Sequence, residues 1–151
     1  MGLFDFVKDA GRYLGLGGED PAAANQAMAD SLVAQVRKNS LDIEDLAISF
    51  DDAVATVSGR VENQVDREKV ILVVGNVQGV AQVDDRIEVV TPEPEATFYT
   101  VKKGDTLSAI AKQHYGNAMK YPVIFGANRP MLENPDKIYP GQVLRIPPLG
   151  P

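Results

Sequence analysis

The sequence contains no cysteine and only one histidine among its 151 residues. The lack of cysteine excludes disulfide scaffolds, thiolate zinc sites and cysteine nucleophiles. A single histidine, His114, cannot form a pair of metal-binding imidazoles, and its place late in a predicted helix is typical of a surface side chain. The sequence also lacks a phosphate-binding glycine loop and a Gly-x-Ser-x-Gly motif. We therefore expect a protein that is not an enzyme.

Long apolar runs and an excess of positive charge are missing as well. No apolar run approaches the roughly 20 residues of a membrane-spanning helix. The first residues lack the basic and apolar regions of a secretory signal. The net charge of −6 argues against nucleic acid and anionic membranes as partners and mildly favours cations. These features predict a monomeric, cytoplasmic protein that binds neither nucleic acid nor membrane.

The residues that are present predict a globular chain in two parts. Apolar residues make up 44% of the sequence and charged residues 24%, which suits a packed core. The segment TPEPEA at 91–96 is acidic and punctuated by proline, so it is expected to be a stiff, solvated linker. We therefore predict an N-terminal helix plus domain over residues 1–90, a linker at 91–96 and a second domain over 97–151.

The first part has the pattern of a small α+β sandwich. Apolar residues from Leu3 to Leu14 fall at helical spacing and predict a short helix. A helix over 22–39 follows, then strands over 46–50 and 53–59 joined by a turn at Asp51-Asp52. Asn63 is placed to cap a helix that runs to about Val74, and a last strand covers 81–90. The order α-β-β-α-β after the short helix predicts helices on one face of a sheet. The segments VATVSGRV, REKVILVVGNVQGV and VDDRIEVV give this part a resemblance to the BON domain.

The second part predicts a β-α-α-β unit. A strand begins near Phe98, Asp105 or Thr106 caps a helix through Tyr115, a second helix covers 121–128, and a strand covers 143–147. The segments YTV, GDTL and IYPGQVLRIP resemble a LysM module. With the opening MGLFDFVKDAG and the central ILVVGN, the whole chain resembles the bacterial cytoplasmic potassium-binding proteins that join a BON and a LysM domain. This resemblance implies a non-enzymatic protein that binds K⁺, with contact between the two domains.

The candidate site is the end of the helix near Val74, where Gly75 and Gly79 break an apolar run. We expect both glycines to permit positive φ and to allow close approach by another group. A helix end leaves carbonyls unpaired, with a negative partial charge that favours a cation. From spacing alone, the two glycines could equally form an ordinary cap and turn.

Because K⁺ is well matched by neutral carbonyl dipoles, it is the ion that such a cluster suits. Together with the resemblance, this predicts that K⁺, and also Rb⁺ and Cs⁺, is bound with compaction of the chain, so that the protein acts as a potassium sensor or buffer. The expected ligands are the main-chain oxygens of Val7, Ala10, Gly75, Val77, Gly79 and Val80. Since main-chain atoms would bind the ion, we expect Asn76→Ala to matter less than Gly75→Val or Gly79→Val.

The resemblance to LysM modules also implies an alternative function, the binding of N-acetylglucosamine polymers such as peptidoglycan. The expected groove is lined by Gly104, Asp105, Thr106, Leu107, Pro135, Asp136 and Ile138. The missing secretory signal argues against it, because peptidoglycan lies outside the cytoplasm. The acidic pairs Asp51-Asp52 and Asp84-Asp85 lack the spacing of a calcium loop, and we assign them to a hairpin turn and to the solubility of a strand end.

Overall fold

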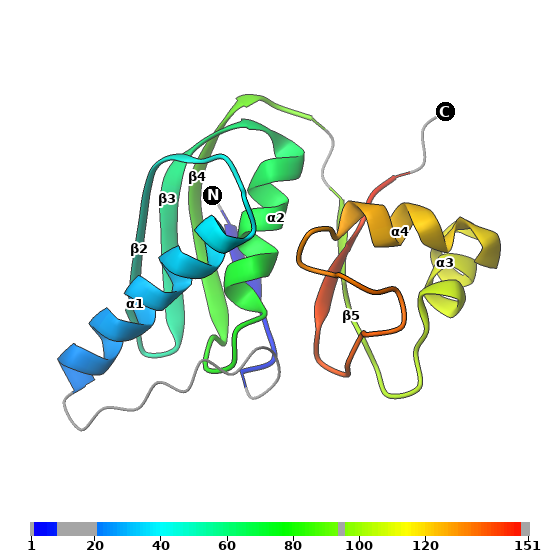
Figure 1. The fold of residues 1–151 in the computed structure, drawn as a ribbon, viewed down its shortest axis with the longest axis horizontal. Coiled ribbons are helices and arrows are strands. Elements are labelled where there is room, and N and C mark those ends of the chain that lie inside the picture. Colours follow the sequence, from blue (N-terminus) through cyan, green and yellow to red (C-terminus); the bar gives the residue numbers. More distant parts are fainter. Residues whose placement is uncertain (1, 9–20, 94–95, 149–151) are drawn as a thin grey trace.

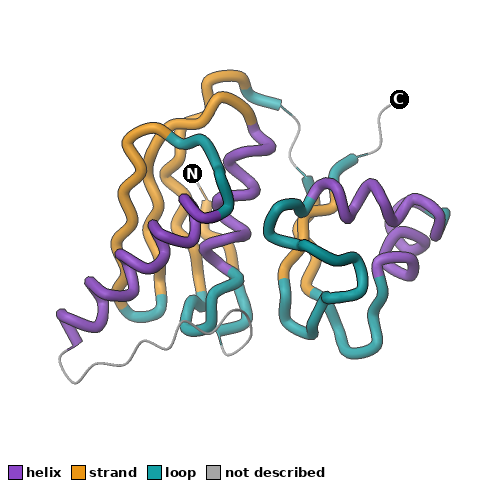
Figure 2. The backbone as a smooth tube through the Cα atoms, in the orientation of Figure 1, coloured by secondary structure: helices purple, strands orange, loops and turns teal. Residues whose placement is uncertain are grey.

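The computed structural model describes residues 2–8, 21–93 and 96–148, in two parts with a sheet each (Figures 1 and 2). The elements of the first part are β1 (Gly2–Asp5), α1 (Pro21–Lys38), β2 (Glu44–Asp51), β3 (Val54–Asn63), α2 (Gln64–Gly75) and β4 (Gln82–Thr91). Those of the second are β5 (Thr97–Thr100), α3 (Leu107–Tyr115), the short 3₁₀ helix η1 (Ala118–Lys120), α4 (Tyr121–Ala127) and β6 (Val143–Ile146).

The first sheet has the strand order β1-β4-β3-β2. Strands β2 and β3 form an antiparallel hairpin, whereas β3 and β4 are parallel and are joined through α2. Parallel neighbours need such a crossover connection, and here the helix packs back onto the strands that it joins. Both α1 and α2 cover one face of the sheet (Figure 1), and the core between them includes Leu32, Val36, Val57 and Ile71. The predicted α-β-β-α-β sandwich is confirmed.

The predicted N-terminal helix is wrong over the described residues, because residues 2–5 form the edge strand β1. Leu3 lies opposite Asp84 and Phe4 opposite Val83, antiparallel to β4. The spacing of the apolar residues fits a helix, but so short a helix is not stable by itself. Pairing with the free edge of β4 instead gives the backbone groups partners. The rest of the predicted helix, residues 9–14, lies outside the described residues.

The predicted N-terminal caps of helices α2 and α3 are present. The side chain of Asn63 accepts a hydrogen bond from the Asp66 N–H at 2.9 Å and begins α2. In the second part, Thr106 accepts from the Ala109 N–H at 3.1 Å and begins α3, which ends at Gly116 with φ of +74°. Strands β5 and β6 pair antiparallel beside the helices, which confirms the β-α-α-β order.

The two acidic pairs have different outcomes. Asp51 ends β2 and Asp52 has φ of +50°, so the first pair forms the predicted hairpin turn. Asp85, assigned above to strand-end solubility, is instead completely buried and forms an ion pair with Arg67 of α2. The alternation along β4 places Val83, Asp85 and Ile87 on the covered face, so the carboxylate needs a cation there. Asp85 also accepts the Ile87 N–H at 2.9 Å.

Candidate functional site

The chain after α2 is wound tightly. The N–H of Asn76, the C-cap residue, donates to the carbonyls of Leu72 and Val74. Val77 then donates to the Val74 carbonyl at 3.4 Å, and Val80 donates to the Val77 carbonyl at 3.1 Å. These bonds make two consecutive turns, which we call the 75–80 loop. Its winding gathers several carbonyls into a short stretch at the negative end of a helix.

The N-terminal segment lies against this loop. The Phe6 N–H donates to the Ala81 carbonyl at 2.8 Å, and the Gly79 N–H donates to the Lys8 carbonyl at 2.6 Å. Val7 lies between these two attachments, so the structure brings it beside the loop as predicted. Ala10 lies outside the described residues.

Four of the predicted oxygens have no donor within the described part of the chain. These are the carbonyls of Val7, Gly75, Gly79 and Val80. The Val77 carbonyl accepts from Val80, which leaves it one further lone pair. Main-chain oxygens without a donor are suited to a cation that needs several neutral ligands.

The two glycines of the loop are required for different reasons. Gly79 has φ of +104°, which side chains rarely adopt, and a Cβ there would meet only the Met28 methyl at 3.6 Å. Gly75 does not have positive φ, so that part of the prediction is wrong. Its requirement is space, because a Cβ on Gly75 would lie 2.1–2.3 Å from atoms of the Phe6 ring. The ring of the N-terminal segment therefore packs directly on the backbone at the end of α2.

The loop contains no charged side chain, and the described residues contain no group of three or more histidines, cysteines or carboxylates that could hold a metal ion. A divalent cation would need such carboxylates. The loop residues Val77 and Val80 are buried as well. The loop therefore offers only main-chain and carboxamide groups as ligands.

The predicted carbohydrate groove has an ordered first loop. Gly104 has φ of +88°, and Asp105 accepts hydrogen bonds from the Tyr99 hydroxyl at 2.6 Å and the Lys102 N–H at 2.8 Å. The hydrogen bond from Tyr99, followed by that from Lys102, lowers the pKa of Asp105, and the same bond and burial raise the pKa of Tyr99 to about 12. Leu107 is buried in the core of the second part, where Ile138 packs against the same cluster. Pro135 and Asp136 precede it in the loop between α4 and β6, where Asp136 donates its N–H to the Asn134 side chain.

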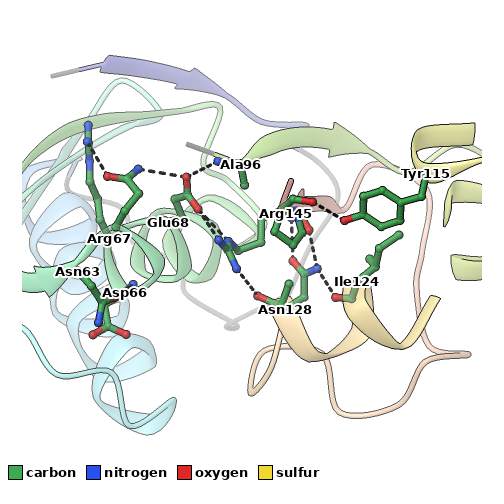
Figure 3. A network of polar contacts seen from close by, with 12 residues as sticks. Asn63, Asp66, Arg67, Glu68, Ala96, Tyr115, Ile124, Asn128 and Arg145 are labelled. Atoms are coloured by element: carbon green, nitrogen blue, oxygen red, sulfur yellow. Dashed lines mark hydrogen bonds and ion pairs between the residues drawn. The ribbon is translucent and has the colours of Figure 1, made fainter. Parts of the chain in front are cut away.

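The two parts of the molecule are joined by a buried ion pair (Figure 3). Arg145 of β6 donates to Glu68 of α2 at 2.7 and 2.9 Å, and the two residues are only 5% and 2% exposed. The other oxygen of Glu68 accepts the Ala96 N–H at 2.8 Å and the Gln64 amide at 3.1 Å. The charges of the carboxylate and the guanidinium therefore compensate each other at a position from which water is excluded.

Asn76 provides a second connection between the parts. Its amide oxygen accepts the Val143 N–H and its amide nitrogen donates to the Val143 carbonyl, both at 2.8 Å. A C-cap residue of the candidate loop thus forms a reciprocal pair with strand β6. Since these bonds are buried, we expect Asn76→Ala to weaken the contact between the two parts, and its rank against the glycine variants stays a prediction.

Sequence reasoning missed Glu68, Arg145 and Phe6. Arg145 carries a signal, because it is a charge inside the apolar stretch VLRIP, whereas Glu68 lies in the charged run DREK and carries none. Charges in such places are paired when the stretch is buried. Phe6 was assigned to a helical stripe, and only the backbone pairing of β1 reveals its contact with Gly75.

Comparison with known proteins agrees with this architecture. The BON domain family matches residues 24–91, and the LysM domain family matches residues 99–147. A protein of Escherichia coli O6:H1 named "Potassium binding protein Kbp" is 50% identical over 152 residues, which covers 97% of this chain and 99% of that protein. This chain belongs to the Kbp family.

Other relatives share only one segment with this member of the Kbp family. An uncharacterised protein of Deinococcus radiodurans is 55% identical over 51 residues, and an esterase of Mycobacterium tuberculosis is 49% identical over 53 residues. The matches cover about a third of this chain but only 19% and 11% of those proteins. These matches are too short to indicate an esterase activity for this chain. Within the described residues, no helix has the length and apolar character needed to cross a bilayer.

Proposed function

We propose that this protein binds K⁺ without catalysing a reaction, through main-chain oxygens of the 75–80 loop and the N-terminal segment. The observation that carries the proposal is the attachment of residues 6–8 to the loop by two backbone hydrogen bonds and by the contact between Phe6 and Gly75. The proposed ligands are the carbonyls of Val7, Ala10, Gly75, Val77, Gly79 and Val80. The name of the Escherichia coli relative supports K⁺ as the ion.

Selectivity follows from the chemistry of these oxygens. Neutral carbonyl dipoles replace the weak hydration shell of K⁺, Rb⁺ or Cs⁺ more readily than that of Na⁺, Li⁺ or Mg²⁺. The absence of carboxylates in the loop also disfavours divalent ions. We therefore expect the protein to discriminate by ion size and hydration rather than by charge alone.

Binding should make the chain more compact. An ion held between the N-terminal segment and the loop would fix the end of α2, and Asn76 at that end contacts β6 of the LysM domain. Ion occupancy would thereby favour the docked arrangement of the two domains. This mechanism suits a potassium sensor or buffer that works as a monomer in the cytoplasm.

Thermal unfolding in KCl and in NaCl at equal ionic strength tests the proposal. At free K⁺ of about 100 times Kd, the folded state gains about 2.7 kcal/mol. For a chain of this size, that corresponds to a rise in Tm of about 5–10 °C. Equal melting temperatures in the two salts would reject the proposal.

A pair of glycine variants localises the effect. Gly79→Ala adds no steric clash but strains the positive φ of the loop, so it should remove most of the difference in Tm between KCl and NaCl. Gly126→Ala, in α4 with nothing within 4 Å of the new Cβ, should retain that difference. Loss of the difference in both variants would argue against binding at the 75–80 loop.

Binding of glycan at the LysM domain is the second candidate, favoured by the family match over residues 99–147 and by the ordered loop at Gly104–Leu107. Sedimentation with purified peptidoglycan tests it, with Asp105→Ala and Pro135→Ala as groove variants. Retention of the wild type and loss in both variants would support it. Failure of the wild type to sediment would reject it.

A further inference from the structure

A cavity of about 620 Å³ lies between the two domains, away from the Gly104–Leu107 loop. One wall comes from α1 and the end of α2, and the other from the segment between α4 and β6. It is lined by Gln35, Asn39, Val73, Asn76, Val77, Met131, Leu132, Glu133, Asn134, Lys137, Tyr139 and Gln142. This volume is in the range of small-molecule sites, which are often found at domain interfaces.

Gln142 gives the cavity an unusual feature. The residue lines the cavity and is only 4% exposed, yet its amide oxygen is buried with no donor among the described residues. Its backbone is fixed, since its N–H donates to the Tyr139 carbonyl and its carbonyl accepts the Val101 N–H. These bonds hold the backbone from which the side chain extends. Buried acceptors without partners are rare and costly in folded proteins.

The lining indicates which ligand would supply the missing donor. Five carboxamide side chains, from Gln35, Asn39, Asn76, Asn134 and Gln142, dominate it. One acid and one base, Glu133 and Lys137, contribute no net charge, so the cavity lacks the clustered basic groups that a phosphorylated ligand needs. Carboxamides both donate to and accept from hydroxyl and amide groups.

We propose that this cavity, which we call the interdomain site, binds a small uncharged molecule that carries several hydroxyl or amide groups. One of its O–H or N–H groups donates to the amide oxygen of Gln142. The ligand contacts both domains, because Gln35 lies in α1 and Asn39 directly after it, whereas Asn134 and Gln142 belong to the LysM domain. The site adjoins the proposed K⁺ site, since Val77 lines the cavity, but its proposed contact with Gln142 does not involve any proposed K⁺ ligand.

Two probe molecules, tested on the full-length protein, distinguish a ligand that donates through hydroxyl groups from one that donates through amide groups. Glucose supplies hydroxyl donors, and N-acetylglycinamide supplies amide donors. Each is titrated to millimolar concentrations while the backbone and side-chain amide signals are followed by ¹H–¹⁵N NMR. We expect at least one probe to shift the side-chain amide signals of Gln142, Gln35 and Asn39. If neither probe moves them, the proposal is overturned.

Gln142→Met tests the acceptor, because methionine has an unbranched side chain of similar length. It should weaken binding of the active probe by about tenfold, the effect of losing one hydrogen bond to a neutral donor. Without probe, it should raise Tm, since it removes an unsatisfied buried oxygen. Gln113→Met, at an exposed position of α3, should change neither quantity.

Gln35→Ala is a second variant, on the opposite wall and only partly buried, that should also weaken probe binding without unfolding the protein. A fall in Tm for Gln142→Met would mean that water already satisfies the amide, and would overturn the proposal. Probe shifts that persist unchanged in both variants would place binding elsewhere and would overturn it too.

Discussion

The contact between the N-terminal segment and the end of α2 depends on the absence of a Cβ atom at position 75. The Phe6 ring occupies the space in which any other residue at position 75 would place its Cβ. Phe6 is 9% exposed, so the ring has little room to move away. A hydrogen atom in place of a methyl group therefore allows the two segments to meet.

Gly75→Ala should destabilise the protein by about 1–3 kcal/mol through overpacking against Phe6. In a Phe6→Ala background the clash is gone, and alanine should be neutral or favoured by up to about 1 kcal/mol, since it is the better helix former. A double-mutant cycle by urea unfolding measures the difference. An equal cost of Gly75→Ala in both backgrounds would contradict the proposed contact.

Because Tyr99 and Asp105 share a hydrogen bond, we expect the stability of the folded state to fall at both high and low pH. The pKa of Tyr99 is raised from 10.0 to about 12, so the stabilisation is present below pH 10.0 and is lost as the pH rises towards about 12. The pKa of Asp105 is lowered from 3.8, so its stabilisation is present above that pH and is lost as the pH falls through the lowered value. Ultraviolet absorbance of the phenolate follows Tyr99 directly.

In that titration, Asp105→Asn should move the Tyr99 step to lower pH, and Tyr99→Phe should remove it. The other four tyrosines provide the reference signal. If the absorbance curve of Asp105→Asn matches that of the wild type, the hydrogen bond does not set the pKa.

At the scale of elements, helix α2 connects every feature of the site. Asn63 begins it, Glu68 on its side binds Arg145, and Gly75 and Asn76 at its end contact Phe6 and Val143. Its middle, Val70 to Val74, is buried. A shift of this helix would therefore disturb the 75–80 loop and the domain contact together.

Asn63→Ala should lower the free energy of unfolding by about 1 kcal/mol, since the Asp66 N–H loses its acceptor. Asn63→Ser retains a capping oxygen and should cost much less. Urea unfolding followed by far-ultraviolet circular dichroism compares the two variants. Equal losses would mean that the cap contributes nothing.

The elements also show how far the sequence predicts this structure. The hairpin at Asp51-Asp52 and the caps at Asn63 and Thr106 depend on local rules, and these predictions are confirmed. Strand β1 could not be predicted, because its four residues become a strand only through pairing with β4. The contact between Phe6 and Gly75 depends on the same pairing. For the ion ligands, the sequence indicates the loop but not which oxygens bind, and that set stays a prediction.

At the scale of the whole molecule, the two domains share buried polar contacts and should unfold together. Glu68→Gln removes the charge that opposes Arg145 but retains an oxygen for the Ala96 N–H. An uncompensated buried charge costs about 3–5 kcal/mol. We expect a single calorimetric transition for the wild type and two for Glu68→Gln, because the domains of the variant separate before the more stable one unfolds.

Glu44→Gln is the matched control, since the ion pair of Glu44 with Arg60 is exposed and contributes little to stability. It should keep the single transition. Two transitions already present in the wild type would show that the contact between the domains does not couple their unfolding.

The two domain contacts differ in what they demand of the partner. At position 143 Asn76 binds main-chain atoms, with a further bond to the Met131 sulfur, whereas Glu68 requires the guanidinium of Arg145. A chimera that carried a foreign LysM module could therefore retain the first contact with almost any residue at position 143. It would retain the second contact only with an arginine at position 145. The residue at that position therefore indicates whether a foreign LysM module can dock on this BON domain.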